Sequence, residues 1–134
     1  MRADATFSAD GFQPANLSPQ PSIETALPVS VAVMVKHFFG EIDGTSATIF
    51  TSAFDHSKKM GTYVAMESFE GDVQGKFGSF NFIHSASTIS GSREDEMFRI
   101  VDGSGIRDFL GIPGSGGIAV DEDGTHRIWL EYQI

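Results

Sequence analysis

The chain has 134 residues, of which 40% are apolar and 12 are Phe. This length suits a single domain, and this composition excludes wholesale disorder. The 9 Lys and Arg stand against 18 Asp and Glu, a formal charge of −9, which argues against binding nucleic acid or an anionic membrane through charge. The absence of Cys excludes disulfides, thiol catalysis and Cys-based zinc sites.

The predicted elements are strands. Residues 3–12 alternate small or apolar side chains with polar ones, which is the period of a half-buried strand. Stretches rich in Val, Ile, Thr and Phe follow at residues 29–41, 45–54, 62–70, 76–87, 97–101, 118–121 and 125–134. Short strands separated by turns are typical of a barrel or sandwich. We therefore predict one all-β domain over residues 1–134, an eight-stranded antiparallel up-and-down β-barrel.

Two segments interrupt this pattern. Residues 13–28 contain four of the five prolines and predict a long Pro-rich loop after the first strand, either a strap across one barrel end or a mobile arm. Residues 102–117 contain six glycines. Within them, residues 106–110 predict one short helical turn, with Ser104 as its N-cap and Gly111 just after its end.

The Gln74-Gly75 pair predicts a hairpin turn that places Glu67 opposite Phe82 and Ala65 opposite His84. Paired side chains share a face, and this aromatic face is expected to point inward. Glu67 and His84 then become diagonal neighbours. They form either a buried polar pair that satisfies itself or a ligand anchor or general acid–base pair.

Two further dipeptides, Asp43-Gly44 and Asp123-Gly124, are typical of type I′ hairpin turns. The first pairs Lys36 with Thr51 and leaves both faces of its hairpin apolar, so the face that lies inside stays open and the other face is a candidate subunit interface. The second pairs Ala119 with Ile128.

No motif points to a cofactor or a metal. The sequence lacks a dinucleotide fingerprint, a Walker loop, a nucleophile elbow and zinc-ligand spacing among its His residues. Glu94-Asp95-Glu96 is interpreted as a solvated loop or the charged guard of an edge strand. The chain begins without a signal-peptide pattern, and residues 29–35 are short of the ~20 apolar residues that span a bilayer. No membrane partner and a cytoplasmic location are expected.

A family resemblance follows from several segments together. Residues 36–46 follow the pattern K-x-F-x-G-x-x-x-G-T-S, and residues 63–67, Gly78-Ser79-Phe80, His84, Gly103-Ser104-Gly105, Leu110-Gly111-Ile112 and residues 126–132 continue the match. The chain in this respect resembles the bacterial domain-of-unknown-function family DUF3224. The resemblance implies a small β-barrel similar to allene oxide cyclase and avidin-type barrels, and it implies no activity.

Three functions follow as hypotheses. The first is a barrel that binds a small apolar ligand, the second a homo-oligomeric structural or interaction protein with a filled barrel, and the third an isomerase or cyclase that uses Glu67 and His84. No nucleic-acid partner is expected. The candidate ligand-binding residues are Lys36, Phe38, Tyr63, Glu67, Phe80, Phe82, His84, His126 and Tyr132.

Overall fold

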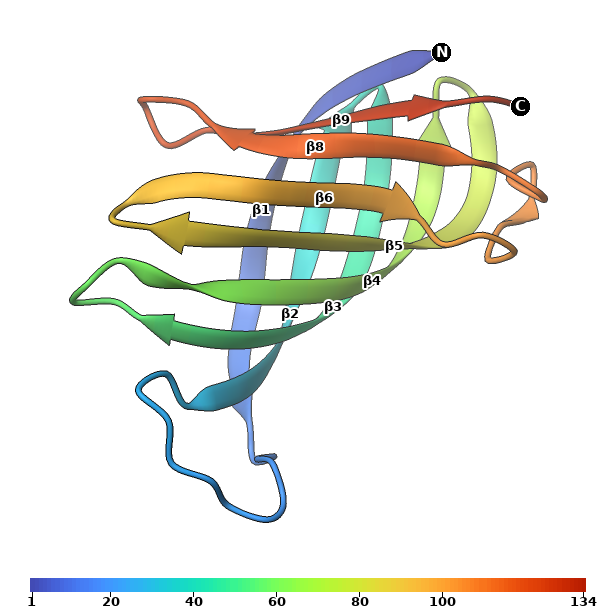
Figure 1. Cartoon of the computed structure of the whole chain (residues 1–134). Helices are drawn as coiled ribbons and strands as arrows, with labels where there is room; N and C mark the ends of the chain where they lie inside the picture. Colours follow the sequence, from blue (N-terminus) through green and yellow to red (C-terminus); the bar gives the residue numbers. More distant parts are fainter.

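A computed structural model describes residues 1–134 and contains strands but no helix. The strands are β1 (Arg2–Ala15), β2 (Val29–Gly40), β3 (Ile42–Asp55), β4 (Met60–Val73), β5 (Lys76–Ile89), β6 (Ser92–Ile100), β7 (Ile106–Arg107), β8 (Gly114–Val120) and β9 (His126–Tyr132) (Figure 1).

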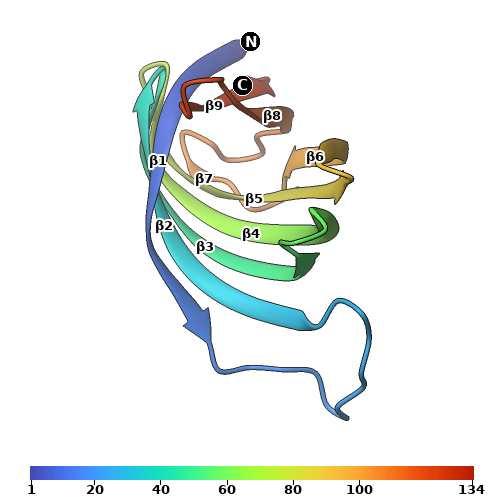
Figure 2. The same cartoon turned by 90° about the vertical axis from the view of Figure 1, so that its left-hand side faces the viewer.

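The sheet closes on itself. Its hydrogen-bonded order runs β4–β3–β2–β1–β9–β8–β6–β5, and a further pairing of β4 with β5 joins the two ends. All pairings are antiparallel, and β7 pairs with β5 outside this ring. The predicted eight-stranded antiparallel barrel is therefore confirmed, with one short extra strand. Figure 2 shows how the strands curve around the interior.

The first strand continues further than predicted. Gln13 and Pro14 pair with Val33 and Ala32 of β2, so the connection between β1 and β2 comprises residues 16–28 instead of 13–28. β1 pairs with β9 only as far as Phe7, and a proline is tolerated where a strand has a free edge. The connection and the adjoining strand ends extend away from the barrel in both views (Figures 1 and 2).

The predicted helical turn at residues 106–110 is wrong. Ile106 and Arg107 form β7 against Gly78 and Ser79 of β5. Arg107 has a φ of 58°, and a single left-handed residue breaks the path of a right-handed helix. The turn that follows places Phe109 in the barrel end with 0% exposure.

The predicted register of the β2–β3 hairpin is also wrong. Lys36 pairs with Ser46 instead of Thr51, because the chain reverses between Gly40 and Ile42, before Asp43-Gly44. Gly40 supplies the positive φ, 127°, at this reversal. The shift also moves Ile49 to the outer face, where it is 58% exposed.

Gly44 has a different role from the one predicted. It lies within β3 opposite Gly71 of β4. A Cβ on Gly44 would lie 2.8 Å from Gly71 Cα. This glycine therefore permits two backbones to approach closely, which is the other common reason for glycine in a strand.

The β8–β9 hairpin is displaced by one residue from the prediction. Ile118, in place of Ala119, pairs with Ile128. The reason is a longer turn: Asp121 N donates to Thr125 O at 2.9 Å, and Gly124 N donates to Asp121 O at 2.9 Å. This pattern of a three-residue loop with a left-handed glycine competes with the two-residue turn.

The β4–β5 register is confirmed. Glu67 pairs with Phe82, and Ala65 pairs with His84. Gln74 and Gly75 have φ values of 51° and 88°, as a type I′ turn requires. The inward orientation of this face is confirmed as well, because Glu67 is 0% and His84 is 2% exposed.

Aromatic and aliphatic side chains fill the half of the barrel on the side of the β4–β5 turn. Phe38, Phe69, Phe80, Phe82 and Phe98 pack there with Ile42, Ile128 and Leu130 around a space of only about 10 Å³. Their rings contact at centroid distances between 4.7 and 6.5 Å, within the range of favourable aromatic pairs. No ligand fits in this half.

Candidate functional site

A cavity of about 200 Å³ occupies the other half of the barrel, toward the end where the β3–β4, β5–β6 and β8–β9 turns lie. Every strand of the ring contributes to its wall. The lining residues are Phe7, Ala9, Met34, Lys36, Phe50, Tyr63, Ala65, His84, Arg93, Ile118, Val120 and His126.

The charge of this lining differs from that of the whole chain. Lys36 and Arg93 bring two cations, and His84, His126 and Tyr63 bring further polar groups. None of the 18 Asp and Glu residues of the chain lines the cavity. The lining therefore combines cationic, polar and apolar side chains, and both of its cations pair with carboxylates outside the lining, Lys36 with Glu67 and Arg93 with Glu96.

Lys36 is held at the inner end of the cavity by a buried ion pair. Its Nζ donates a hydrogen bond to Glu67 Oε2 at 2.6 Å, and it also lies 5.2 Å from the centre of the Phe7 ring. Lys36 is on β2 and Glu67 on β4, and the two side chains meet across β3. They can do so because β3 places only Ser46 and Thr48 between them on the inner face.

Three buried oxygens around this pair lack a hydrogen-bond partner. They are Ser46 Oγ, Thr48 Oγ1 and Glu67 Oε1. Buried polar atoms are normally satisfied by protein or by ordered water. This polar cluster lies behind Lys36, and none of its three members lines the cavity.

His84 belongs to a separate network with Tyr63, Arg93 and Glu96. A carboxylate only accepts hydrogen bonds, so His84 Nε2 donates to Glu96 Oε2 at 3.0 Å. His84 Nδ1 then accepts from the Tyr63 hydroxyl at 3.2 Å. Arg93 Nη2 completes the ring by donating to the Tyr63 oxygen at 2.7 Å and to Glu96 Oε2 at 3.0 Å.

Burial favours the neutral form of His84. Burial lowers the pKa of His84, and Arg93 and Lys36 lower it further, whereas Glu96 raises it. Burial also raises the pKa of Tyr63, so its hydroxyl stays protonated. A neutral imidazole beside a protonated phenol leaves Arg93 and Lys36 as the charged groups of the wall.

The structure distributes the predicted site residues over four places. Lys36, Tyr63, His84 and His126 line the cavity together. Phe38, Phe80 and Phe82 belong to the filled half. Glu67 lies behind Lys36, and Tyr132 lies at the opposite end of the barrel, where its hydroxyl donates to Gln74 Oε1.

The expected partnership of Glu67 with His84 does not form. Glu67 accepts a hydrogen bond from Lys36, and the side chain of His84 hydrogen-bonds Tyr63 and Glu96. The reason is that each residue has a stronger partner on another strand. Glu67 and His84 therefore share no hydrogen bond, and the structure does not support an acid–base pair formed by these two residues.

Arg93 and Glu96 were missed by the sequence reasoning. The sequence predicts Glu96 in a solvated loop or as the charged guard of an edge strand, yet Glu96 accepts hydrogen bonds from His84 at 3.0 Å and from the amide of Ile118 at 3.4 Å. A signal existed, because Glu96 has the same parity as the inward-facing Phe98. The irregular pairing between Ser85 and Ser87 of β5 and the left-handed Asp95, at φ 54°, obscure that parity.

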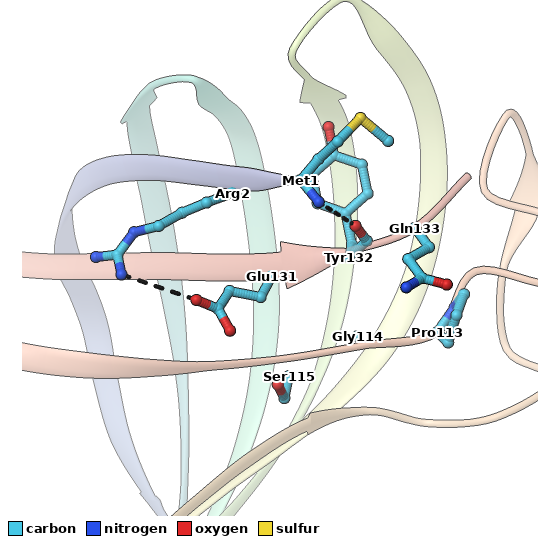
Figure 3. A pocket seen from close by; sticks show the side chains of 8 residues that line it. All are labelled: Met1, Arg2, Pro113, Gly114, Ser115, Glu131, Tyr132 and Gln133. Carbon is cyan, nitrogen blue, oxygen red and sulfur yellow. Dashed lines mark hydrogen bonds and ion pairs between the residues drawn. The ribbon is translucent and has the colours of Figure 1, made fainter.

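A larger hollow, of about 510 Å³, lies at the surface beside both termini (Figure 3). Met1, Arg2, Glu131 and Tyr132 surround it. Arg2 and Glu131 are exposed partners 3.9 Å apart, and Met1 N donates to Tyr132 O at 2.8 Å. The hollow is an open gap between polar chain ends and lacks enclosing apolar walls.

No group of three or more His, Cys, Asp or Glu residues is placed to hold a metal ion. The chain contains no helix with the length and apolarity needed to cross a membrane. The expected cytoplasmic location stays a prediction.

The fold and the cavity define a small closed up-and-down β-barrel that is filled at one end and open at the other. The chain belongs to DUF3224, a family of proteins of unknown function, whose model matches residues 3–132. The family resemblance found in the sequence is therefore confirmed, and the likeness to allene oxide cyclase and avidin-type barrels stays a prediction.

One solved relative shows the same fold. The crystal structure of a DUF3224 protein of unknown function from Shewanella oneidensis MR-1 is similar with a TM-score of 0.87 and 22% sequence identity. The match covers 100% of this chain and 96% of that chain. A comparison with curated proteins found no match.

Proposed function

We propose that this barrel binds a small molecule with an anionic head group and an apolar body. The observation that carries the proposal is the composition of the cavity wall, with Lys36 and Arg93 present and every carboxylate absent. Glu67 and Glu96 each pair with one of these cations from outside the lining, and only the cations face the cavity, so the wall offers an anion hydrogen-bond donors and no repelling carboxylate.

Lys36 has unused hydrogen-bond donors for such a ligand. Its ammonium group carries three N–H donors but has one hydrogen-bond acceptor, Glu67 Oε2. Because Lys36 lines the cavity, the other donors are available to a carboxylate there. Arg93, whose side chain is 38% exposed, offers a second cation closer to solvent, and charge-assisted bonds of this kind are among the strongest hydrogen bonds.

The apolar body of the ligand is limited in size. The cavity of about 200 Å³ is below the roughly 300–1,000 Å³ of sites for drug-sized molecules, whereas an apolar cavity of about 150 Å³ holds benzene. Phe7, Phe50 and Ile118 supply an apolar wall. A monocyclic aromatic acid or a short branched carboxylic acid fits both the volume and the chemistry.

Calorimetric titration with benzoate tests the proposal, with benzamide as the neutral ligand of the same shape. We expect benzoate to bind, benzamide to bind more weakly, and Arg93→Gln to weaken benzoate roughly tenfold, the effect of one lost charge-assisted hydrogen bond. Arg99→Gln is the matched control, because Arg99 lies on the same strand with its side chain exposed. Equal binding of the two ligands, or equal effects of the two variants, would refute the proposal.

Native mass spectrometry of protein purified gently from its own host complements this titration. A reproducible extra mass of small-molecule size would identify the natural ligand class directly. We expect that mass to disappear in Arg93→Gln and to persist in Arg99→Gln.

A further inference from the structure

The outer surface of the barrel carries a band without charge across β2, β3, β4 and β5. The register places Val33, Ile49, Met66 and Ile83 side by side in one row on these strands. One row of outward-facing residues flanks this row on each side, and a fourth row lies beyond the one that contains Val31. These three rows hold only Val, Ala, Thr, Ser and Asn. We call these four rows the uncharged face.

The apolar members of this face are open to solvent. Val33 is 40%, Ile49 58%, Met66 45% and Val64 41% exposed. Scattered apolar residues on a surface are ordinary, but a contiguous apolar patch marks an interaction site. In a chain of net charge −9, a band of this extent without a single Asp, Glu, Lys or Arg needs a physical reason.

We infer that the uncharged face is a two-fold interface between two copies of this chain. A second copy can dock on this face although each chain carries a net charge of −9, because this face brings no like charges into contact. The shape argues for a second copy. Val33, Ile49 and Met66 flank a hollow of about 340 Å³ on the same face, so the face offers both a protruding side chain and a depression, as a self-complementary contact requires.

The area of the face is sufficient for a modest dimer. The face spans four strands that lie about 4.8 Å apart. Its four rows are two residues apart along each strand, at about 3.3 Å per residue, so the face covers roughly 500 Å² of sheet per copy. Two copies together bury about 1,000 Å², the lower limit for a specific interface, against roughly 1,600 Å² for a standard one. The dimer is therefore expected to be reversible and dependent on concentration.

Analytical ultracentrifugation over a range of concentrations provides the test. The wild-type mass is expected to rise from 14.4 kDa toward twice that value. Ile49→Glu and Met66→Glu are expected to raise the dimer dissociation constant roughly tenfold or more, because they place like charges against each other at a two-fold contact. Leu110→Glu is the matched control, since Leu110 is 81% exposed in a turn away from this face, and it is expected to leave the dissociation constant unchanged.

A second readout does not depend on charged variants. The chain has no Cys, so Ile49→Cys introduces a single thiol whose alkylation rate reports burial. We expect this rate to fall as protein concentration rises, whereas the rate for Leu110→Cys stays constant. A wild-type chain that remains monomeric at high concentration, or a dimer that forms without slowing alkylation at Ile49→Cys, would overturn the inference.

Discussion

Lys36 of β2 and Glu67 of β4 form an ion pair inside the barrel, with Nζ and Oε2 2.6 Å apart, across a strand that neither residue belongs to. Glu67 has a side-chain exposure of 0% and Lys36 of 9%. Their arrangement makes each charge depend on the other, because an unpaired charge in such a site loses its hydration without compensation.

This dependence predicts a strong coupling between the two positions. Lys36→Met leaves the Glu67 carboxylate buried alone and is expected to lower the free energy of unfolding by about 3–5 kcal/mol. The double variant Lys36→Met with Glu67→Met removes both charges at similar side-chain volume and is expected to regain most of that loss. Urea unfolding of the two single variants and the double variant measures the coupling, and purely additive losses would contradict it.

The pH dependence of stability follows from His84. Burial lowers its pKa in the folded protein, so between the ordinary value of about 6.5 and the lower folded value the unfolded chain binds more protons. The free energy of unfolding should therefore fall as the pH falls below about 6.5, with a slope of up to ~1.4 kcal/mol per pH unit from this residue.

We would measure the free energy of unfolding of wild type and of His84→Gln from pH 7.5 to pH 5. The difference between the two proteins isolates the contribution of His84, since the other His residues are common to both. His126→Gln is a suitable control because His126 is exposed. The account is wrong if the His84→Gln difference stays constant over this range.

The filled half of the barrel predicts a contrast between two phenylalanines. Phe69 is 2% exposed among other aromatic rings, whereas Phe39 is 58% exposed on the outer surface. Phe69→Ala is expected to cost about 3–5 kcal/mol through a cavity in the core, and Phe39→Ala should change the stability by no more than about 0.5 kcal/mol. Urea unfolding measures both; similar losses would mean that this half is not packed as described.

The contact between β6 and β8 is the weakest part of the ring. These strands share one register pair, Arg99 with Ser115, whereas β8 and β9 pair along all of Gly114–Val120. Local opening is therefore expected there first. Amides at the β6–β8 contact should exchange with deuterium much faster than those between β3 and β4.

Because Arg93 of β6 and Ile118 of β8 both line the cavity, bound benzoate is expected to slow this exchange. Hydrogen exchange followed by mass spectrometry, with and without benzoate, measures it. If calorimetry shows that benzoate binds but the exchange at this contact is unchanged, benzoate binds outside the cavity.

The sequence alone determined the strand content and the β4–β5 hairpin. Alternation along a strand and the geometry of a two-residue turn depend only on residues adjacent in the chain. The turn at Gln74-Gly75 was therefore sufficient to predict the pairing of Glu67 with Phe82. The same logic failed at Asp43-Gly44, because glycine is needed both where φ is positive and where two backbones approach closely, and only the neighbouring strand distinguishes these cases.

Tertiary structure decided the partners of the buried charges and the division of the barrel. Glu67 meets Lys36 because the β2–β3 and β3–β4 pairings set them on either side of β3, with only the small side chains Ser46 and Thr48 between them. The irregularity in the β5–β6 pairing brings Arg93 onto the inner face that Glu96 and His84 already share. These contacts join side chains of different strands, so they depend on how the strands pair and on burial inside the closed barrel, which alternation along a single strand does not specify.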